Sequence, residues 1–135
     1  MLVVALRAIG ASNVVLGIAH VFLWRVFAWT RETKRLSPLT ARVFAVHTFF
    51  VAFVLVLLGA LALLHADLLV APSALGRLVC GATAVFWLLR LLAQPFVFDP
   101  VLLLESRWRA PLRIVASTYF ATCALVFAWA FENQP

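Results

Sequence analysis

TARVFAVHTFFVAFVLVLLGALALL, residues 40–64, is the stretch of the chain that decides its fold. A helix needs about 20 mostly apolar residues to cross a hydrocarbon core roughly 30 Å thick, and this stretch meets that length. Three other stretches are long and largely apolar, at residues 4–28, 73–94 and 112–131. We therefore predict an all-α integral membrane protein, a single domain over residues 1–135 in which four transmembrane helices form an up-down bundle.

The composition of the chain excludes an ordinary soluble domain. Hydrophobic residues make up 66% of the sequence, whereas soluble domains average nearer half apolar. The mean hydropathy is +1.10. In a soluble protein, the formal net charge of +6 would suggest nucleic acid as the partner. Here the basic residues lie between the apolar stretches, so we expect them to meet anionic lipid headgroups and predict no nucleic-acid partner.

The charges of the three links predict the orientation of the chain. Residues 29–40 and 95–111 carry several Arg and Lys, while residues 65–72 carry Asp67 and neither Arg nor Lys. The basic residues of the first and third links are Arg31, Lys34, Arg35, Arg107 and Arg109. Short links rich in Lys and Arg stay on the cytoplasmic side. We predict a protein of a bacterial inner membrane, with both termini outside and the basic links cytoplasmic.

Two dipeptides, Ser37-Pro38 and Asp99-Pro100, predict where helices begin. Ser37 before Pro38 is typical of an N-cap followed by proline at the first helical position. Asp99 and Pro100 repeat that pattern and predict a short helix over residues 101–108. Its sequence VLLLESRW mixes apolar with charged residues, so we expect this helix to lie in the headgroup region rather than to cross the membrane.

Small and polar residues fall on one face of each of two predicted helices. In residues 4–28 and in residues 73–94 they recur three or four positions apart, which places them on one side of a helix. The two stripes consist of Gly10, Asn13, Gly17, His20 and Trp24, and of Gly76, Cys80, Thr83, Trp87, Arg90 and Gln94. Such faces turn away from lipid, so we expect them to form the packing seams of the bundle and to line any site.

His20 and His47 form the most specific constellation in the chain. Both lie on the order of 15 Å from the inner helix ends, at about 1.5 Å per residue. Two histidines at matched depth on adjacent antiparallel helices can be the axial ligands of a b-type haem iron, or can hydrogen-bond a quinone carbonyl. The residues expected to line such a cofactor site are His20, His47, Arg90, Gln94, Asn13 and Trp87. Another transition metal would need a third and a fourth ligand, and none is evident.

Structural roles explain the same residues without a ligand. A histidine within the membrane is often a hydrogen-bond partner between helices. Arg90 lies about one turn before Pro95, so its long side chain can reach the interface. Cys80 and Cys123 fall inside predicted helices at similar depth. Two inert buried thiols and a disulfide are both open for them.

The sequence contains no complete catalytic signature and no motif that assigns it to a family, so we predict no catalytic residue. Four helices with short links leave little room for an independent catalytic site, and their hydrophobic surface is large enough to dock neighbours or lipids. We therefore expect a non-catalytic subunit of a larger membrane assembly, in contact with membrane lipids and with other membrane subunits or further copies of itself. The alternative is a redox or lipophilic-ligand protein that binds b-type haem or quinone through His20 and His47.

Overall fold

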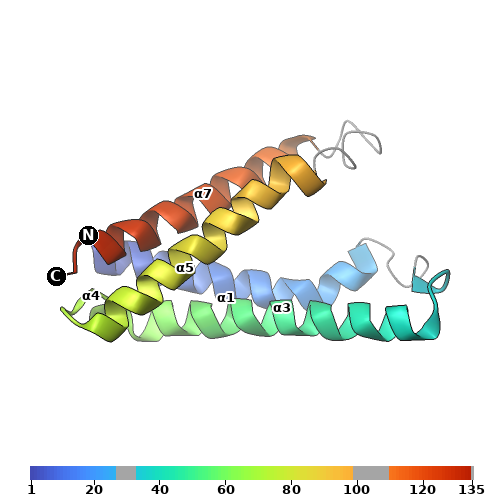
Figure 1. Ribbon diagram of the computed structural model, residues 1–135, viewed down its shortest axis with the longest axis horizontal. Coiled ribbons are helices and arrows are strands. Elements are labelled where there is room, and N and C mark those ends of the chain that lie inside the picture. Colours follow the sequence, from blue (N-terminus) through green and yellow to red (C-terminus); the bar gives the residue numbers. More distant parts are fainter. Residues whose placement is uncertain (27–32, 99–109, 135) are drawn as a thin grey trace. The chain divides into compact units, whose positions relative to one another are not determined.

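The computed structural model describes residues 1–26, 33–98 and 110–134, and within these ranges the chain forms helices, turns and bends without a strand (Figure 1). Four of the described helices are long and apolar enough to cross a membrane. These are α1 (Leu2–Val26), α3 (Pro38–Leu64), α5 (Ala74–Ala93) and α7 (Ala110–Glu132). The predicted all-α class and the four apolar helices are therefore confirmed, while the up-down bundle stays a prediction.

The helix bounds differ from the sequence-based spans in several places. Helix α1 begins at Leu2 rather than at residue 4, and α7 begins at Ala110 rather than at residue 112. The second link, predicted as a loop, contains a short helix, α4 (Ala66–Val70). Helix α5 continues into a π-helical turn, η1 (Gln94–Phe98). Pro95 lies in this turn, and a proline cannot donate the N–H that a regular α-helical turn requires, so the wider turn accommodates it. The predicted helix over residues 101–108 lies outside the described residues.

The chain divides into two compact units, and the first one, Leu6–Ala66, is a helical hairpin of α1 and α3. Glycines bring the two backbones into contact. A Cβ built on Gly10 would overlap the backbone of Leu63, and one built on Gly17 would lie 2.9 Å from the carbonyl oxygen of Ala52. Residues later in α1 thus face residues earlier in α3, so the two helices are antiparallel. Glycine is needed at these positions because any side chain would separate the helices.

The start of α3 follows the prediction made from the sequence. Ser37 is the N-cap, with its hydroxyl accepting the Thr40 N–H at 3.2 Å, and Pro38 opens the helix. The proline has no N–H to satisfy in the first turn and its fixed φ suits a helix start. The hydroxyl of Ser37 meets one of the backbone donors that a helix N-terminus leaves without a partner.

The second unit comprises Met1–Ala5 and Asp67–Pro135, and its main part is the hairpin of α5 and α7. Trp87 of α5 stacks on Phe120 of α7, while Gly81 of α5 faces the ring of Phe131 near the end of α7. The two helices are therefore antiparallel as well. Ser73 caps α5 and accepts the Gly76 N–H at 3.0 Å.

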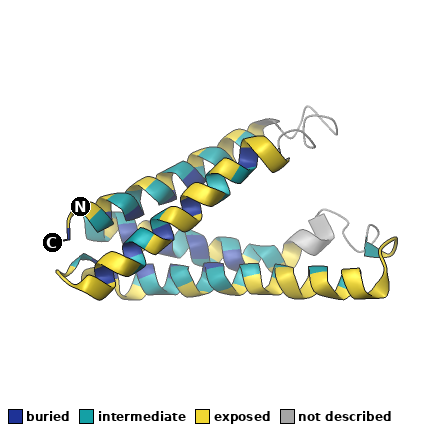
Figure 2. Ribbon diagram, in the orientation of Figure 1, coloured by how far each residue is buried: buried dark blue, intermediate teal, exposed yellow. Residues whose placement is uncertain are grey.

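Four hydroxyls of the long helices have their hydrogen-bond acceptors inside their own helices. Each donates to the backbone carbonyl three or four positions earlier, at 2.8–2.9 Å: Ser12 to Ile9, Thr48 to Phe44, Thr83 to Val79 and Thr122 to Thr118. Such bonds leave no hydroxyl hydrogen to be met by water, which suits a helix surrounded by hydrocarbon. Much of each long helix is exposed (Figure 2). Many of the exposed side chains are large and apolar.

Candidate functional sites

The six residues predicted to line a cofactor site are divided between the two hairpins. Asn13, His20 and His47 belong to the hairpin of α1 and α3. Trp87 and Arg90 lie on α5, and Gln94 directly follows it as the first residue of η1. Each unit therefore holds three of the six predicted residues.

His20 is half-buried. A hydrogen bond to a backbone carbonyl determines which nitrogen of the neutral ring carries the hydrogen. The Nδ1 atom lies 2.8 Å from the carbonyl oxygen of Leu16, one turn earlier in α1. Because a carbonyl oxygen only accepts hydrogen bonds, Nδ1 carries the hydrogen of the neutral imidazole and donates it. The Nε2 atom then holds a lone pair, which can accept a hydrogen bond or bind a metal ion.

His47 is exposed on α3. Gly17 lies against both Ala52 and Val56, and counting along the antiparallel helices from the midpoint of these two contacts places His20 level with about residue 51. His47 then lies about one turn, roughly 6 Å, further along the hairpin axis. At about 100° per residue, it is rotated by about 140° from Ala52, which faces α1, so His47 points away from that helix. The hairpin by itself does not direct the two imidazoles toward each other, and their use as a ligand pair stays a prediction.

Asn13 lies at a close approach of the two helices of this hairpin. Its side chain is fully buried. A Cβ on Gly59 would lie 2.9 Å from the Cβ of Asn13 and 2.8 Å from the N atom of Val14. The absence of a side chain at Gly59 therefore makes the room that Asn13 occupies. Its position is typical of the polar residues that join helices within membranes.

Trp87 is the largest fully buried side chain among the described residues. Its ring stacks on Phe120 with centroids 5.6 Å apart and 22° between the planes, and it meets Tyr119 edge-on at 5.7 Å. Within the described parts of the chain, the buried indole N–H has no hydrogen-bond acceptor. A buried polar group without a partner is uncommon in proteins, so this N–H is a candidate donor to a ligand.

Arg90 is half-buried, and both Arg90 and Trp87 contact the ring of Phe120. Its guanidinium carbon lies 4.5 Å from the centroid of the Phe120 ring, and its Nη1 donates to the Oε1 of Gln94 at 3.3 Å. Gln94 is itself buried. We call Trp87, Arg90, Gln94, Tyr119 and Phe120 the aromatic cluster. Its donors lie in apolar surroundings, which suits the binding of a hydrogen-bond acceptor such as a carbonyl or an anionic group.

The two cysteines are both free and fully buried. Gly81, next to Cys80, faces Phe131. Phe131 lies eight residues beyond Cys123, about 12 Å along the axis of α7 at 1.5 Å per residue. A disulfide needs Cα atoms within roughly 7 Å, so the fold separates the two thiols too far for a bridge.

No sequence pattern predicted the contact that Gln134 makes after α7. The side-chain amide of Gln134 donates to the carbonyl oxygen of Leu69 in α4, and its Nε2 lies 3.7 Å from the Sγ of Cys80. The thiol of Cys80 also lies within 3.6 Å of the Leu69 oxygen. These three residues connect α4, α5 and the C-terminus. A glutamine after the last helix has no periodic pattern that would predict this role.

Residues 1–26, 33–98 and 110–134 contain no group of three or more His, Cys, Asp or Glu residues placed to hold a metal ion.

The fold and these sites define the class of the protein as a helical membrane protein with four candidate membrane-spanning helices. Its chain matches no protein-family model, and no curated protein or solved structure is significantly similar to it.

Proposed function

We propose that this protein is a non-catalytic subunit of a larger membrane assembly, and that the outward face of α3 is where it meets a neighbour. The observation that carries this proposal is a row of exposed aromatic rings on α3. Phe49, Phe50 and Phe53 are each at least half exposed. Their rings nevertheless pack together, with Phe49 edge-on to Phe50 at 5.6 Å and parallel to Phe53 at 6.4 Å.

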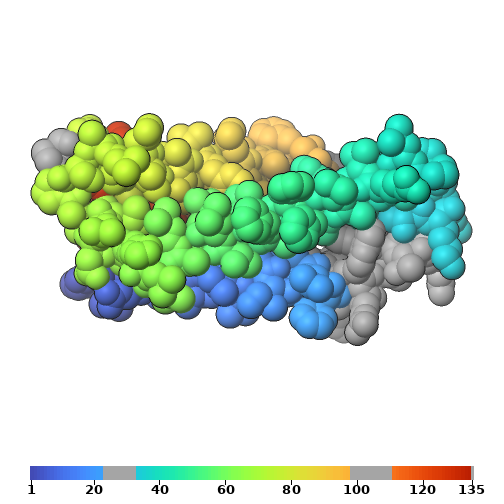
Figure 3. Space-filling view, turned by 90° about the horizontal axis from the view of Figure 1, so that it is seen from below, coloured from blue at the N-terminus to red at the C-terminus, as the bar shows by residue number. Residues whose placement is uncertain are grey.

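The aromatic row suits a protein partner because its rings already support one another. Phenylalanine buries a large area while only two side-chain torsions are fixed, and aromatic residues are enriched in interface cores. Helix α3 has the smallest fraction of buried residues among the four long apolar helices. Figure 3 shows its side chains, coloured cyan to green, as a continuous strip along one face. The helix therefore offers much surface to lipids, other subunits or another copy of the chain.

We also propose how the helices are arranged in the membrane. The four helices form an up-down bundle in a bacterial inner membrane, with both termini outside and the basic first and third links in the cytoplasm. This orientation is supported by the charge of the links, since Asp67 is the charged residue of residues 65–72.

Extraction in a mild detergent tests the subunit proposal. Full-length protein with an affinity tag should copurify with a stoichiometric membrane partner, or with an untagged second copy. The double substitution Phe49→Ala and Phe53→Ala should abolish this association. Leu125→Ala on α7, which is likewise exposed, is the matched control and should leave it intact. Elution of the wild-type protein as a lone monomer under the same conditions would refute the proposal.

A second candidate function, binding of b-type haem or quinone, is favoured by the hydrogen bond of His20. The bond from Nδ1 to the Leu16 carbonyl leaves Nε2 available. Histidines that ligate metals commonly donate their other ring nitrogen to a backbone carbonyl in this way. In this function either His20 and His47 bind the haem iron or a quinone carbonyl, or the donors of Trp87, Arg90 and Gln94 in the other unit bind the polar end of a quinone.

The absorption spectrum and the extracted lipids distinguish these ligands. A haem protein should show a Soret band that His20→Ala and His47→Ala each remove. A quinone protein should be colourless in that region and release quinone into organic solvent, with less quinone recovered from Arg90→Gln. A sample with neither signal would exclude this second function and leave the first unaffected.

A further inference from the structure

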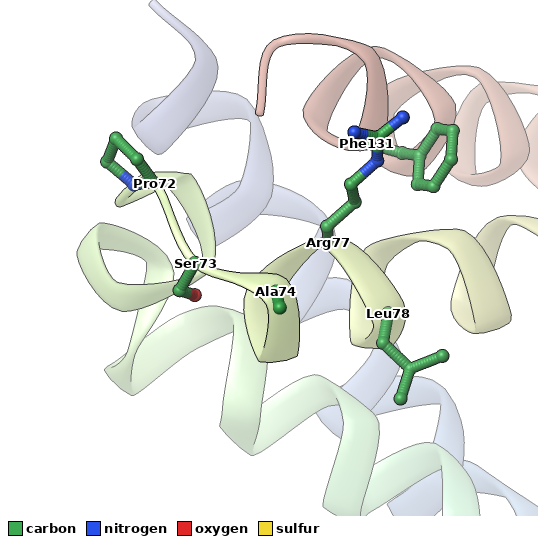
Figure 4. A pocket seen from close by; sticks show the side chains of 6 residues that line it. All are labelled: Pro72, Ser73, Ala74, Arg77, Leu78 and Phe131. Carbon is green, nitrogen blue, oxygen red and sulfur yellow. The ribbon is translucent and has the colours of Figure 1, made fainter. Parts of the chain in front are cut away.

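We propose that a hollow at one end of the hairpin of α5 and α7 binds the phosphate headgroup of an anionic phospholipid. The hollow has a volume of about 550 Å³. Its lining residues are Pro72, Ser73, Ala74, Arg77, Leu78 and Phe131 (Figure 4). This inference does not depend on the subunit proposal, because lipid binding here needs no protein partner.

The polar side of the hollow consists of hydrogen-bond donors. Arg77 is exposed, and none of the described acidic side chains forms an ion pair with it. Its guanidinium carbon lies 4.8 Å from the centroid of the Phe131 ring, which holds the cation at the rim (Figure 4). The Ser73 hydroxyl accepts the Gly76 N–H, so its own hydrogen is left to donate. Guanidinium and hydroxyl donors together are complementary to phosphate oxygens.

The apolar side of the hollow favours a lipid over a free anion. Leu78 is 67% exposed, and with the Phe131 ring it continues the hollow along the two helices. A free phosphate ion would leave this surface uncovered, whereas an acyl chain attached to the phosphate would cover it.

The hollow also lies where lipid headgroups are expected. Helix α5 begins at Ala74 and α7 ends at Glu132, so the lining residues stand at a boundary of two candidate membrane spans. Arginine side chains near such boundaries direct their charge to the headgroups. Glu132 follows Phe131 and is exposed. Its carboxylate does not line the hollow, where Arg77 is the charged lining residue.

Native mass spectrometry of the full-length protein in detergent tests this site. The protein is titrated with dioleoylphosphatidylglycerol, with dioleoylglycerol, which has the same chains and no phosphate, and with inorganic phosphate. The variant Arg77→Gln should weaken phosphatidylglycerol binding by about tenfold, as expected for the loss of a charge-assisted hydrogen bond. Arg77→Lys should retain part of the affinity because it retains the charge. Arg42→Gln removes the same charge from an exposed position of α3 and should leave the affinity unchanged.

Three results would overturn the proposal. Equal losses in Arg77→Gln and Arg42→Gln would mean that the lipid responds to net charge alone. Equal binding of dioleoylglycerol would remove the role of the phosphate. Full displacement of the lipid by inorganic phosphate, which itself binds in an Arg77-dependent manner, would make the occupant a free anion. Circular dichroism of each variant should match the wild-type spectrum, because Arg77 and Arg42 are exposed.

Discussion

Gly59 of α3 and Gly10 of α1 touch through their backbones. A Cβ built on Gly59 would lie 2.8 Å from the carbonyl oxygen of Gly10, closer than real Cβ atoms come to such an atom. The obstructing atoms belong to the backbone, so no side-chain rotation can relieve the overlap. The closest approach of this hairpin therefore requires glycine at residue 59.

We expect Gly59→Val to destabilise the protein by about 1–3 kcal/mol, the usual cost of overpacking a tight contact. The free energy of unfolding can be measured in mixed micelles by titration with a denaturing detergent. Leu57→Val is the control, since Leu57 is exposed near the same level of α3. It should change the free energy by less than about 0.5 kcal/mol. Equal stability of the two variants would contradict the close contact.

The sequence predicted those features that repeat along a helix. Length and hydropathy gave the four long helices, and the spacing of Gly10 and Gly17 indicated a face that turns away from lipid. The local pattern of Ser37 and Pro38 predicted the start of α3 correctly. Each of these features depends on residues within a few turns of one another, so the chain itself contains the information.

Features that depend on a distant segment were not predictable in this way. The spacing of His20 and His47 gave their depth in each helix but not the rotation of α3 about its axis, which exposes His47. The position of Gln134 against Leu69 joins segments 65 residues apart. Trp87 was predicted to lie on an inward face, and it is buried. Its stacking on Phe120 required the register between α5 and α7, which the sequence does not provide.

The end of the chain should be a stabilising element rather than a free tail. Gln134→Ala removes one donor to the Leu69 carbonyl, a bond that is buried. We expect a loss of about 1 kcal/mol, the usual net contribution of one hydrogen bond, because the Cys80 thiol still donates to the Leu69 oxygen. Asn133→Ala is the matched control because Asn133 is exposed and bonds only within its own helix end, to the Trp129 carbonyl at 2.8 Å. Thermal unfolding followed with a thiol-reactive dye reports both, because the cysteines are buried in the native state. Identical midpoints for Gln134→Ala and Asn133→Ala would refute this role.

Cys80 and Cys123 should remain unreactive and unbridged in the native protein. Both are fully buried, and the register of α5 and α7 holds them apart. Treatment with a maleimide should add no mass to the native protein and should add two labels after unfolding in sodium dodecyl sulfate. Copper phenanthroline should give no internal disulfide by mass spectrometry. Formation of that disulfide in the folded protein would mean that the register of this hairpin is wrong.

The proposed orientation predicts the side of each link. Alkaline phosphatase fused after Pro135 should be active, because the enzyme folds only outside the cytoplasm and the C-terminus is expected there. The same enzyme fused after Leu36, in the basic first link, should be inactive. A fluorescent protein that folds only in the cytoplasm should give the reverse pattern at both positions. An active phosphatase after Leu36 would contradict the rule that basic links stay inside.

Two substitutions of Trp87 separate its packing from its hydrogen-bonding capacity. Trp87→Ala removes the ring that stacks on Phe120 and should cost about 3–5 kcal/mol. Trp87→Phe keeps an aromatic ring but removes the indole N–H, which has no acceptor among the described residues. In protein freed of bound lipid, Trp87→Phe should therefore cost about 1 kcal/mol or less, the range of a conservative core replacement. If Trp87→Phe proves as damaging as Trp87→Ala, the indole N–H has an acceptor and is not available to a ligand. If only the sample with copurified lipid loses stability in Trp87→Phe, the acceptor belongs to a lipophilic ligand.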